Sequence, residues 1–260
     1  MILAAALPGF IIGVLLGMLG GGGSILMVPV FVYVLHFEPK HAIGMSLFVV
    51  GLTSLAGAIN YHRRRNVDFR VAILFGSAAM AATYVASHLA MYVSGAVQLI
   101  LFALVMLVGA TMMFRRTGQI MPPPDHHSIP FSPRRRLLFI TKGLGVGALT
   151  GLVGVGGGFL IVPALVLIGN LPMKRAVGTS LLIIAMNAAV GFIGYYGRIE
   201  IDWLLMVVIT LVATTGMIVG TKLARRVPAA MLRRAFAIFL VIMAGFILYQ
   251  SRGTLLELFA

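Results

Sequence analysis

The chain contains a long internal repeat built around two glycine clusters. The stretch Gly17–Phe69 aligns without a gap with Gly151–Trp203, 134 residues later, and 18 of the 53 aligned positions are identical. Each copy places its cluster, Gly20–Gly23 or Gly156–Gly158, inside an apolar run that continues to a proline five or six residues on. Such duplicated clusters are typical of secondary transporters, in which glycine interrupts a membrane helix and leaves backbone amides free to hold a substrate.

The composition is that of an integral membrane protein. Of the 260 residues, 60% are hydrophobic and 10% are charged, whereas soluble domains carry about 25% charged residues. The mean hydropathy is +1.07. The first 20 residues lack a basic region and a cleavage signal, so we expect a membrane segment there rather than a signal peptide. Cysteine is absent, which excludes disulfides, thiolate catalysis and cysteine-based metal sites.

The chain has a net charge of +14, and 14 of its 20 basic residues fall in three groups between apolar runs. They are Arg63, Arg64, Arg65 and Arg70; Arg115, Arg116, Arg134, Arg135 and Arg136; and Lys222, Arg225, Arg226, Arg233 and Arg234. Basic residues in short loops mark the cytoplasmic side of a membrane protein. We therefore expect the loops 62–70, 115–136 and 222–234 to be cytoplasmic and to contact membrane lipid, and we expect no nucleic-acid partner.

Ten apolar segments predict an all-α integral membrane fold. They cover about residues 2–19, 24–36, 43–61, 71–92, 96–114, 137–153, 159–169, 177–197, 203–221 and 235–250. A helix needs about 20 residues to span a bilayer, so the segments 24–36 and 159–169, which directly follow the glycine clusters, are too short. A Pro-rich cytoplasmic linker, 115–136, separates a first transmembrane repeat, 1–114, from a second, 137–260.

The loop charges predict that the two repeats have inverted topologies. With the basic loops inside, the stretch 137–197 must carry the chain from inside to outside, which two complete crossings cannot do. Either 137–153 and 159–169 form a re-entrant hairpin before one crossing at 177–197, or the chain crosses three times with one short oblique helix. We favour the hairpin because 159–169 is short. Each repeat then contains a helix that is broken by glycine or re-entrant, after about residues 20 and 154.

The acidic residues narrow the class of substrate. They are Glu38, Asp68, Asp125, Glu200, Asp202 and Glu257, and all fall in predicted loops or ends. Transporters of metal ions and other cations use carboxylates within the membrane. Their absence from the predicted spans argues against a divalent-metal transporter and weakens a carboxylate proton relay. We expect no metal site, because the only adjacent histidines, His126 and His127, lie in the polar linker.

The residues after each glycine cluster predict a binding site for a small anion. A helix N-terminus carries partial positive charge and unsatisfied N–H donors, and glycine lets a ligand approach the backbone. The helix that follows adds hydroxyl and amide groups, spaced so that they share a face. The predicted site comprises Gly21, Gly22, Gly23, Ser24, Ser46, Thr53, Gly156, Gly157, Gly158, Thr179, Ser180 and Asn187. Close helix packing and interhelical hydrogen bonds are the alternative roles.

Two further pairs of aligned residues stand near the ends of predicted helices. Lys40 and Lys174 lie at the mouths of the expected hairpins, where a lysine either attracts an anion or is solvated. Tyr61 and Tyr195 lie near helix ends, and we expect them to be interfacial anchors.

The repeated motif resembles the TauE/SafE family of sulfite exporter-like membrane proteins. It reads Gly17-x-x-Gly20-x-Gly22-Gly23 with Pro29 and Ala42-x-Gly44-x-Ser46, and again Gly151-x-x-Gly154-x-Gly156-Gly157 with Pro163 and Ala176-x-Gly178-Thr179-Ser180. The resemblance covers both halves and implies a bacterial or archaeal inner-membrane permease of seven to eight helices. It further implies transport of sulfite, sulfoacetate, another organosulfonate or a small anion. Met45 and Ser24 depart from the threonine and the glycine of the family pattern.

We therefore expect a secondary transporter for a small anion, which works without a cofactor by alternating access between the two repeats. A passive anion channel and a lipid-handling or structural membrane protein are the alternatives. An enzyme would need a nucleophile with a base, a carboxylate pair or a metal site, and the predicted spans offer none. The Gly/Ala-rich stretch 76–82 permits close helix contact, either within the chain or across a homodimer.

Overall fold

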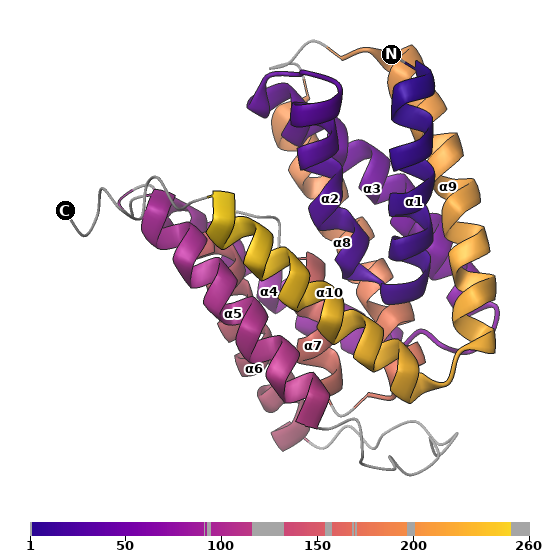
Figure 1. The fold of residues 1–260 in the computed structure, drawn as a ribbon. Helices are drawn as coiled ribbons and strands as arrows, with labels where there is room; N and C mark the ends of the chain where they lie inside the picture. Colours follow the sequence, from indigo (N-terminus) through magenta and orange to yellow (C-terminus); the bar gives the residue numbers. More distant parts are fainter. Residues whose placement is uncertain are drawn as a thin grey trace.

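In the computed structural model, all elements of the described part of the chain are helical. That part comprises residues 2–90, 92, 95–115, 133–153, 158–167, 169, 171–196 and 201–250. The elements are α1 (Ile2–Leu19), the 3₁₀-helix η1 (Gly21–Gly23), α2 (Ser24–Pro29), the π-helix η2 (Val30–Val34), α3 (Pro39–His62), α4 (Phe69–Ala90), α5 (Gly95–Arg115), α6 (Pro133–Val153), α7 (Gly158–Leu167), α8 (Met173–Tyr195), α9 (Trp203–Arg226) and α10 (Ala229–Gln250) (Figure 1). Within this part, α3, α4, α8, α9 and α10 contain stretches long and apolar enough to cross a membrane. The prediction of an all-α, multi-pass membrane protein is confirmed.

Four helices of the second half begin 134 residues after their equivalents in the first half. The starts of α2, α3, α4 and α5 are Ser24, Pro39, Phe69 and Gly95, and those of α7, α8, α9 and α10 are Gly158, Met173, Trp203 and Ala229. Two equivalent helices are also capped alike. Asp68 Oδ1 accepts a hydrogen bond from Val71 N at 3.1 Å at the start of α4, and Asp202 Oδ1 accepts one from Leu205 N at 3.0 Å at the start of α9. The offset of the sequence repeat therefore extends beyond the aligned stretch to the last helix.

The two halves of the sequence are interleaved in space. Helix α1 packs along α9, and its equivalent α6 packs along α4, while α3 packs on α8 and α5 on α10 (Figure 1). Exchanging each helix for its equivalent leaves this set of four pairings unchanged. The first helix of each half therefore packs along a helix of the other half, α1 along α9 and α6 along α4.

Glycines four residues apart bring these paired helices together backbone to backbone. A Cβ on Gly13 would overlap the carbonyl of Ala213 in α9, and a Cβ on Gly147, the equivalent position in α6, would overlap the carbonyl of Ala79 in α4. Small residues at such positions drive helix association in membranes, since they allow the backbones to approach closely. This stripe of glycines was not predicted from the sequence.

Helix α1 ends in a turn that requires glycine. Gly20 has φ +71°, which side chains with a Cβ rarely adopt. The chain then turns back, because Gly23 lies against α1, and a Cβ on it would stand 2.7 Å from both Ile12 O and Leu16 N. Helix α2 consequently runs beside α1 (Figure 1).

The helices that follow the glycine clusters are short. Helix α7 has 10 residues, and α2 and η2 have 6 and 5, so each unit is about 15 Å long against about 30 Å of hydrocarbon. Both end in the same wide turn, in which Leu35 N donates to Val30 O at 3.1 Å and Gly169 N donates to Ala164 O at 3.0 Å. Each accepting carbonyl follows directly after the repeated proline, whose missing N–H and bulky ring disturb the regular helix.

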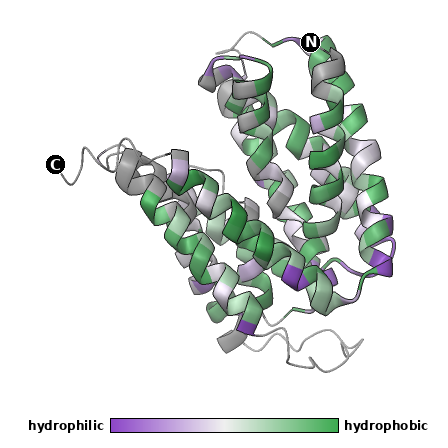
Figure 2. Cartoon of the chain, viewed as in Figure 1, coloured by the Kyte–Doolittle hydropathy of each residue, from purple (hydrophilic) through white to green (hydrophobic). Residues whose placement is uncertain are grey.

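Hydrophobic residues dominate the helices, and strongly hydrophilic residues lie mainly at the helix ends and turns (Figure 2). We call the end that carries Arg64 and Arg225, which line one hollow, the basic end. Leu7, Leu204 and Ile193 expose 68%, 69% and 73% of their surface, as expected for side chains that face lipid. At the basic end α3 leads into α4 and α9 leads into α10. Lys174 Nζ donates to Arg225 O at 3.1 Å there and joins the start of α8 to the end of α9. Arg64 and Arg225 line the same hollow, so the basic groups around residues 62–70 and 222–234 lie together.

Candidate functional site

The candidate site lies where the two short helices begin. Ser24 opens α2, and Gly158 opens α7 at the equivalent position of the repeat. These two residues touch, since a Cβ on Gly158 would stand 2.7 Å from Ser24 Oγ. The N-termini of the two half-helices, with their partial positive charges, therefore converge on one point.

The first glycine turn lies beside the same point. A Cβ on Gly20 would stand 2.6 Å from Ser180 Oγ of α8, and Ser24 Oγ donates to Gly21 O at 2.7 Å. Gly21 and Gly23 are buried in this turn. The structure thus brings together the first glycine cluster, the start of α7 and the serine of the Gly-Thr-Ser triplet.

The two repeated serines make the same local hydrogen bond. Ser46 Oγ donates to Ile43 O at 2.7 Å, and Ser180 Oγ donates to Val177 O at 2.8 Å. Both serines are buried. Because each hydroxyl proton is engaged by the serine's own helix, only the oxygen lone pairs face the surroundings in this conformation, and a proton would reach an anion only after the hydroxyl rotates.

Thr53 and Asn187 stand at equivalent positions on α3 and α8. These helices run antiparallel, because a Cβ on Gly51 would stand 3.3 Å from Ala188 Cβ and one on Gly191 would stand 3.1 Å from Leu47 Cδ1. Thr53 and Asn187 therefore lie at nearly the same level of the pair.

Their polar atoms lack partners. Thr53 is 1% exposed, and Thr53 Oγ1, the neighbouring Ser54 Oγ and Asn187 Oδ1 are buried without a hydrogen bond to any described residue. An unsatisfied buried polar atom costs about 1–3 kcal/mol. Such groups call for an explanation, and a bound ligand or water is the usual one.

Thr179 has a different environment from its neighbour Ser180. Its Oγ1 accepts a hydrogen bond from Asp68 N at 3.0 Å, in the segment between α3 and α4. Asp68 Oδ2 also lies 3.4 Å from Arg175 Nη2. The Thr179 hydroxyl thus holds the segment before α4. Gly22 lies within η1, while Gly156 and Gly157 lie outside the described residues.

Tyr61 was expected to be an interfacial anchor, and that expectation is wrong. Only 5% of its surface is exposed, and its hydroxyl donates to Gly17 O at 2.9 Å. This carbonyl belongs to the last turn of α1, where helical carbonyls have no partner within the helix. Tyr61 therefore secures the end of α1 just before the glycine turn. Tyr61 and Gly17 are both identical in the second copy of the repeat, as Tyr195 and Gly151. That both positions are repeated was the sequence signal that Tyr61 has a structural role.

The described residues include no group of three or more histidine, aspartate or glutamate side chains that could hold a metal ion. The polar groups near the centre are backbone amides, hydroxyls and a carboxamide. Such groups suit an oxyanion, because they donate hydrogen bonds without bringing negative charge.

Comparison with known proteins identifies the relatives of the chain. The sequence profile described as "Sulfite exporter TauE/SafE" matches residues 5–247. A probable membrane transporter protein of Xylella fastidiosa (strain Temecula1) is 31% identical over 252 residues, which cover 95% of each chain. The probable membrane transporter protein YdhB of Bacillus subtilis is 27% identical over 226 residues, 87% of this chain and 91% of the relative. A probable membrane transporter protein of Methanocaldococcus jannaschii is 30% identical over 195 residues, 72% and 69% of the two chains.

No solved structure matches the chain significantly. The profile spans both halves and reaches all ten α-helices of the described part. The relatives are named as transporters, and none of these three names describes an enzyme. The chain therefore belongs to the TauE/SafE family of sulfite exporter-like membrane transporters.

Proposed function

We propose that the protein is a secondary transporter that carries a small oxyanion or organosulfonate, such as sulfite or sulfoacetate, across the cell inner membrane. The observation that carries this proposal is the contact between Ser24 and Gly158. It places two half-helix N-termini together, and helix N-termini attract anions through their dipole and free N–H groups. The family name, with its reference to sulfite, supports the same class of substrate.

The anion is held by uncharged donors at the centre of the α3–α8 pair. Backbone amides of Gly21–Gly23 and Gly156–Gly158 bind the charged head group beside Ser24, whose own amide donates to Gly21 O. The Thr53 hydroxyl and Asn187 Nδ2 complete the shell as donors. The described acids support an anion rather than a cation, since Glu38, Asp68 and Asp202 all precede helix starts at Pro39, Phe69 and Trp203. An anion in the centre therefore meets no carboxylate from these residues.

The two repeats have inverted topology, and the axis that relates them passes near the α3–α8 contact. The antiparallel run of these two equivalent helices and the contact between Ser24 and Gly158 support such an axis. The loops 62–70, 115–136 and 222–234 face the cytoplasm, and the short helices α2 and α7 re-enter rather than span. Alternating access then comes from movement about the central α3–α8 contact, with α1 travelling with α9 and α6 with α4, because their glycine contacts are backbone to backbone.

Isosteric substitution of Thr53 and Asn187 tests the central site. Thr53→Val and Asn187→Leu remove polar atoms that have no partner among the described residues, so the folded protein should be as stable as the wild type or slightly more stable. Loss of a hydrogen bond to a charged ligand costs about 1.5–3 kcal/mol, so sulfite uptake into proteoliposomes should fall by about tenfold or more.

Thr111→Val is the matched control, because Thr111 is exposed and its hydroxyl bonds to Val108 O of its own helix, at 2.9 Å. It should leave uptake unchanged. Wild-type uptake by folded Thr53→Val and Asn187→Leu proteins would contradict the assignment of the site.

A further inference from the structure

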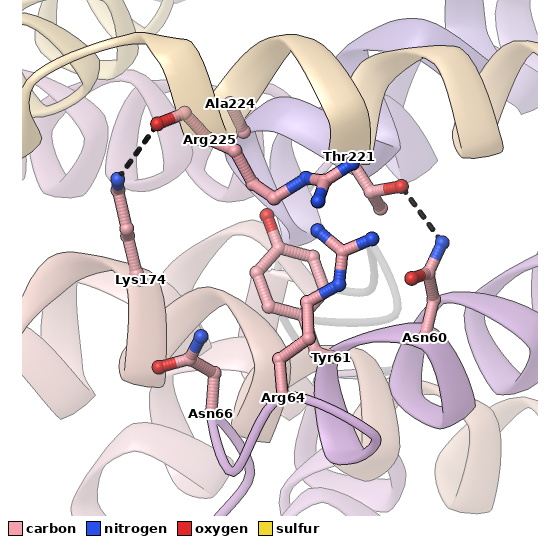
Figure 3. Close-up of a pocket in the computed structure, with 8 residues that line it drawn as sticks. All are labelled: Asn60, Tyr61, Arg64, Asn66, Lys174, Thr221, Ala224 and Arg225. Carbon is pink, nitrogen blue, oxygen red and sulfur yellow. Dashed lines mark hydrogen bonds between the residues drawn. The ribbon is translucent and has the colours of Figure 1, made fainter.

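A polar hollow opens at the basic end, and none of its lining residues belongs to the central site. It is a small hollow that is partly open to the surface. The C-terminal end of α3 and the segment after it, the start of α8 and the end of α9 form its walls (Figure 3). Its lining residues are Asn60, Tyr61, Arg64, Asn66, Lys174, Thr221, Ala224 and Arg225.

The lining carries three cationic side chains and no carboxylate. The guanidinium groups of Arg64 and Arg225 point toward one another across the hollow (Figure 3). Neither guanidinium makes a hydrogen bond or an ion pair with any residue in the described part of the chain. Two like charges that face each other repel, and an anion between them would convert this repulsion into attraction.

The acids of the described chain do not neutralise this pair. Asp68 is the one closest to Arg64 in the sequence, and it is engaged by Arg175 at 3.4 Å and by the amide of Val71 at 3.1 Å. Glu38 and Asp202 precede the starts of α3 and α9, whereas the hollow lies at the other ends of these helices. At 24 residues each, these helices are about 36 Å long, which is several times the screening length at physiological salt.

Hydrogen bonds between the helices fix the walls of the hollow, and they leave the two guanidinium groups able to bind a ligand. Lys174 Nζ donates to Arg225 O at 3.1 Å and ties α8 to α9, and Asn60 Nδ2 donates to Thr221 Oγ1 at 3.0 Å and ties α3 to α9 (Figure 3). A guanidinium presents a planar fork of N–H donors that matches the oxygens of a sulfur or phosphorus oxyanion. A fixed frame lowers the cost of ordering these groups on binding.

We propose that this hollow, which we call the basic vestibule, binds a tetrahedral or pyramidal oxyanion between Arg64 and Arg225. Its wall includes Tyr61, which bonds to Gly17 three residues before the glycine turn, so the vestibule lies next to the central site on the basic side. Its role as the point where the transported anion is collected or released rests on the proposed function; its capacity to bind an oxyanion does not.

The test measures the binding of inorganic sulfate to the purified full chain in nanodiscs of neutral phosphatidylcholine. Arg64→Gln and Arg225→Gln should each raise the dissociation constant for sulfate by about tenfold or more, since each removes a charge-assisted contact. Arg63→Gln and Arg226→Gln are matched controls, because Arg63 and Arg226 are exposed neighbours that do not line the vestibule. They should change the affinity less than about twofold. Thermal unfolding of each variant verifies that it is folded.

A second arm adds anionic phosphatidylglycerol to the nanodiscs. If the lipid displaces sulfate in the wild type but no longer binds to Arg64→Gln, the vestibule also accepts lipid phosphate, and the oxyanion pocket stands. Equal sulfate affinities for the vestibule variants and their controls, in both lipids, would overturn the proposal. The combined Thr53→Val and Asn187→Leu protein separates the two sites. We expect this protein to lose transport but to bind sulfate at the vestibule as tightly as the wild type. If it still transports, the central site is wrong, while the vestibule proposal is unaffected.

Discussion

Thr53 and Asn187 occupy equivalent positions, yet one is a hydroxyl and the other a carboxamide. Other equivalent residues behave alike: Ser46 and Ser180 bond to the carbonyl three residues earlier, and Asp68 caps α4 as Asp202 caps α9. The shared contacts are structural, because they satisfy the backbone or side chain of the same helix in both halves. The alignment of the repeats predicts that Thr53 and Asn187 are equivalent positions. Only the packed structure shows that their polar atoms lack partners among the described residues.

The hydrogen bond from Tyr61 to Gly17 yields a prediction at the scale of one residue. Tyr61→Phe leaves a buried carbonyl at the end of α1 without a donor and should lower the free energy of unfolding by about 1–2 kcal/mol. Tyr196→Phe is the control, since the Tyr196 side chain is 61% exposed. Thermal unfolding in detergent measures both variants, and equal stability of the two would refute the role given to Tyr61.

The apolar segments of the sequence located all ten α-helices of the described part but not their full lengths. The predicted segments 43–61 and 235–250 correspond to Pro39–His62 and Ala229–Gln250. The missing turns hold polar residues, such as the exposed Arg234, which lower the hydropathy of a segment without preventing it from being helical. Hydropathy does not say which helices pack together, so the apolar segments alone could not predict the pairing of α1 with α9. The four-residue spacing of the glycines in both helices was the sequence signal that pointed to a close contact.

Two glycines of α6 test the backbone packing of paired helices. A Cβ added to Gly145 would have nothing within 4 Å, whereas a Cβ on Gly147 would overlap the Ala79 carbonyl. Gly145→Ala should therefore raise stability by up to about 1 kcal/mol, because alanine favours helix. Gly147→Ala should lower it, because α4 and α6 must separate. Unfolding midpoints that shift in the same direction for both variants would contradict this packing.

At the scale of the whole molecule, the basic end defines the expected orientation in the membrane. The chain has no cysteine, so single cysteines report their own position. Arg65→Cys should resist a membrane-impermeant maleimide in intact cells and react after lysis, because the proposed topology places the basic end in the cytoplasm. Tyr196→Cys, beyond the other end of α8, should react in intact cells. Labelling of Arg65→Cys in intact cells would reverse the topology.

The interleaved halves also explain why the sequence alone left the mechanism open. The repeat suggests that one half moves against the other, yet α1 is held to α9 and α6 to α4 by close glycine contacts. Movement between strictly sequential halves would have to break these contacts. We expect the moving units to exchange helices between the halves, with the α3–α8 pair and the anion at the centre.

Counterflow of radiolabelled sulfite in proteoliposomes is the most direct test of a carrier with a central anion site. Vesicles are loaded with unlabelled sulfite and diluted into a trace of labelled sulfite. We expect the wild-type protein to accumulate label transiently above its equilibrium level, because an alternating-access carrier exchanges one anion for another, and we expect Thr53→Val to lose this overshoot. A steady approach to equilibrium without overshoot would indicate a passive channel and would contradict the proposed mechanism.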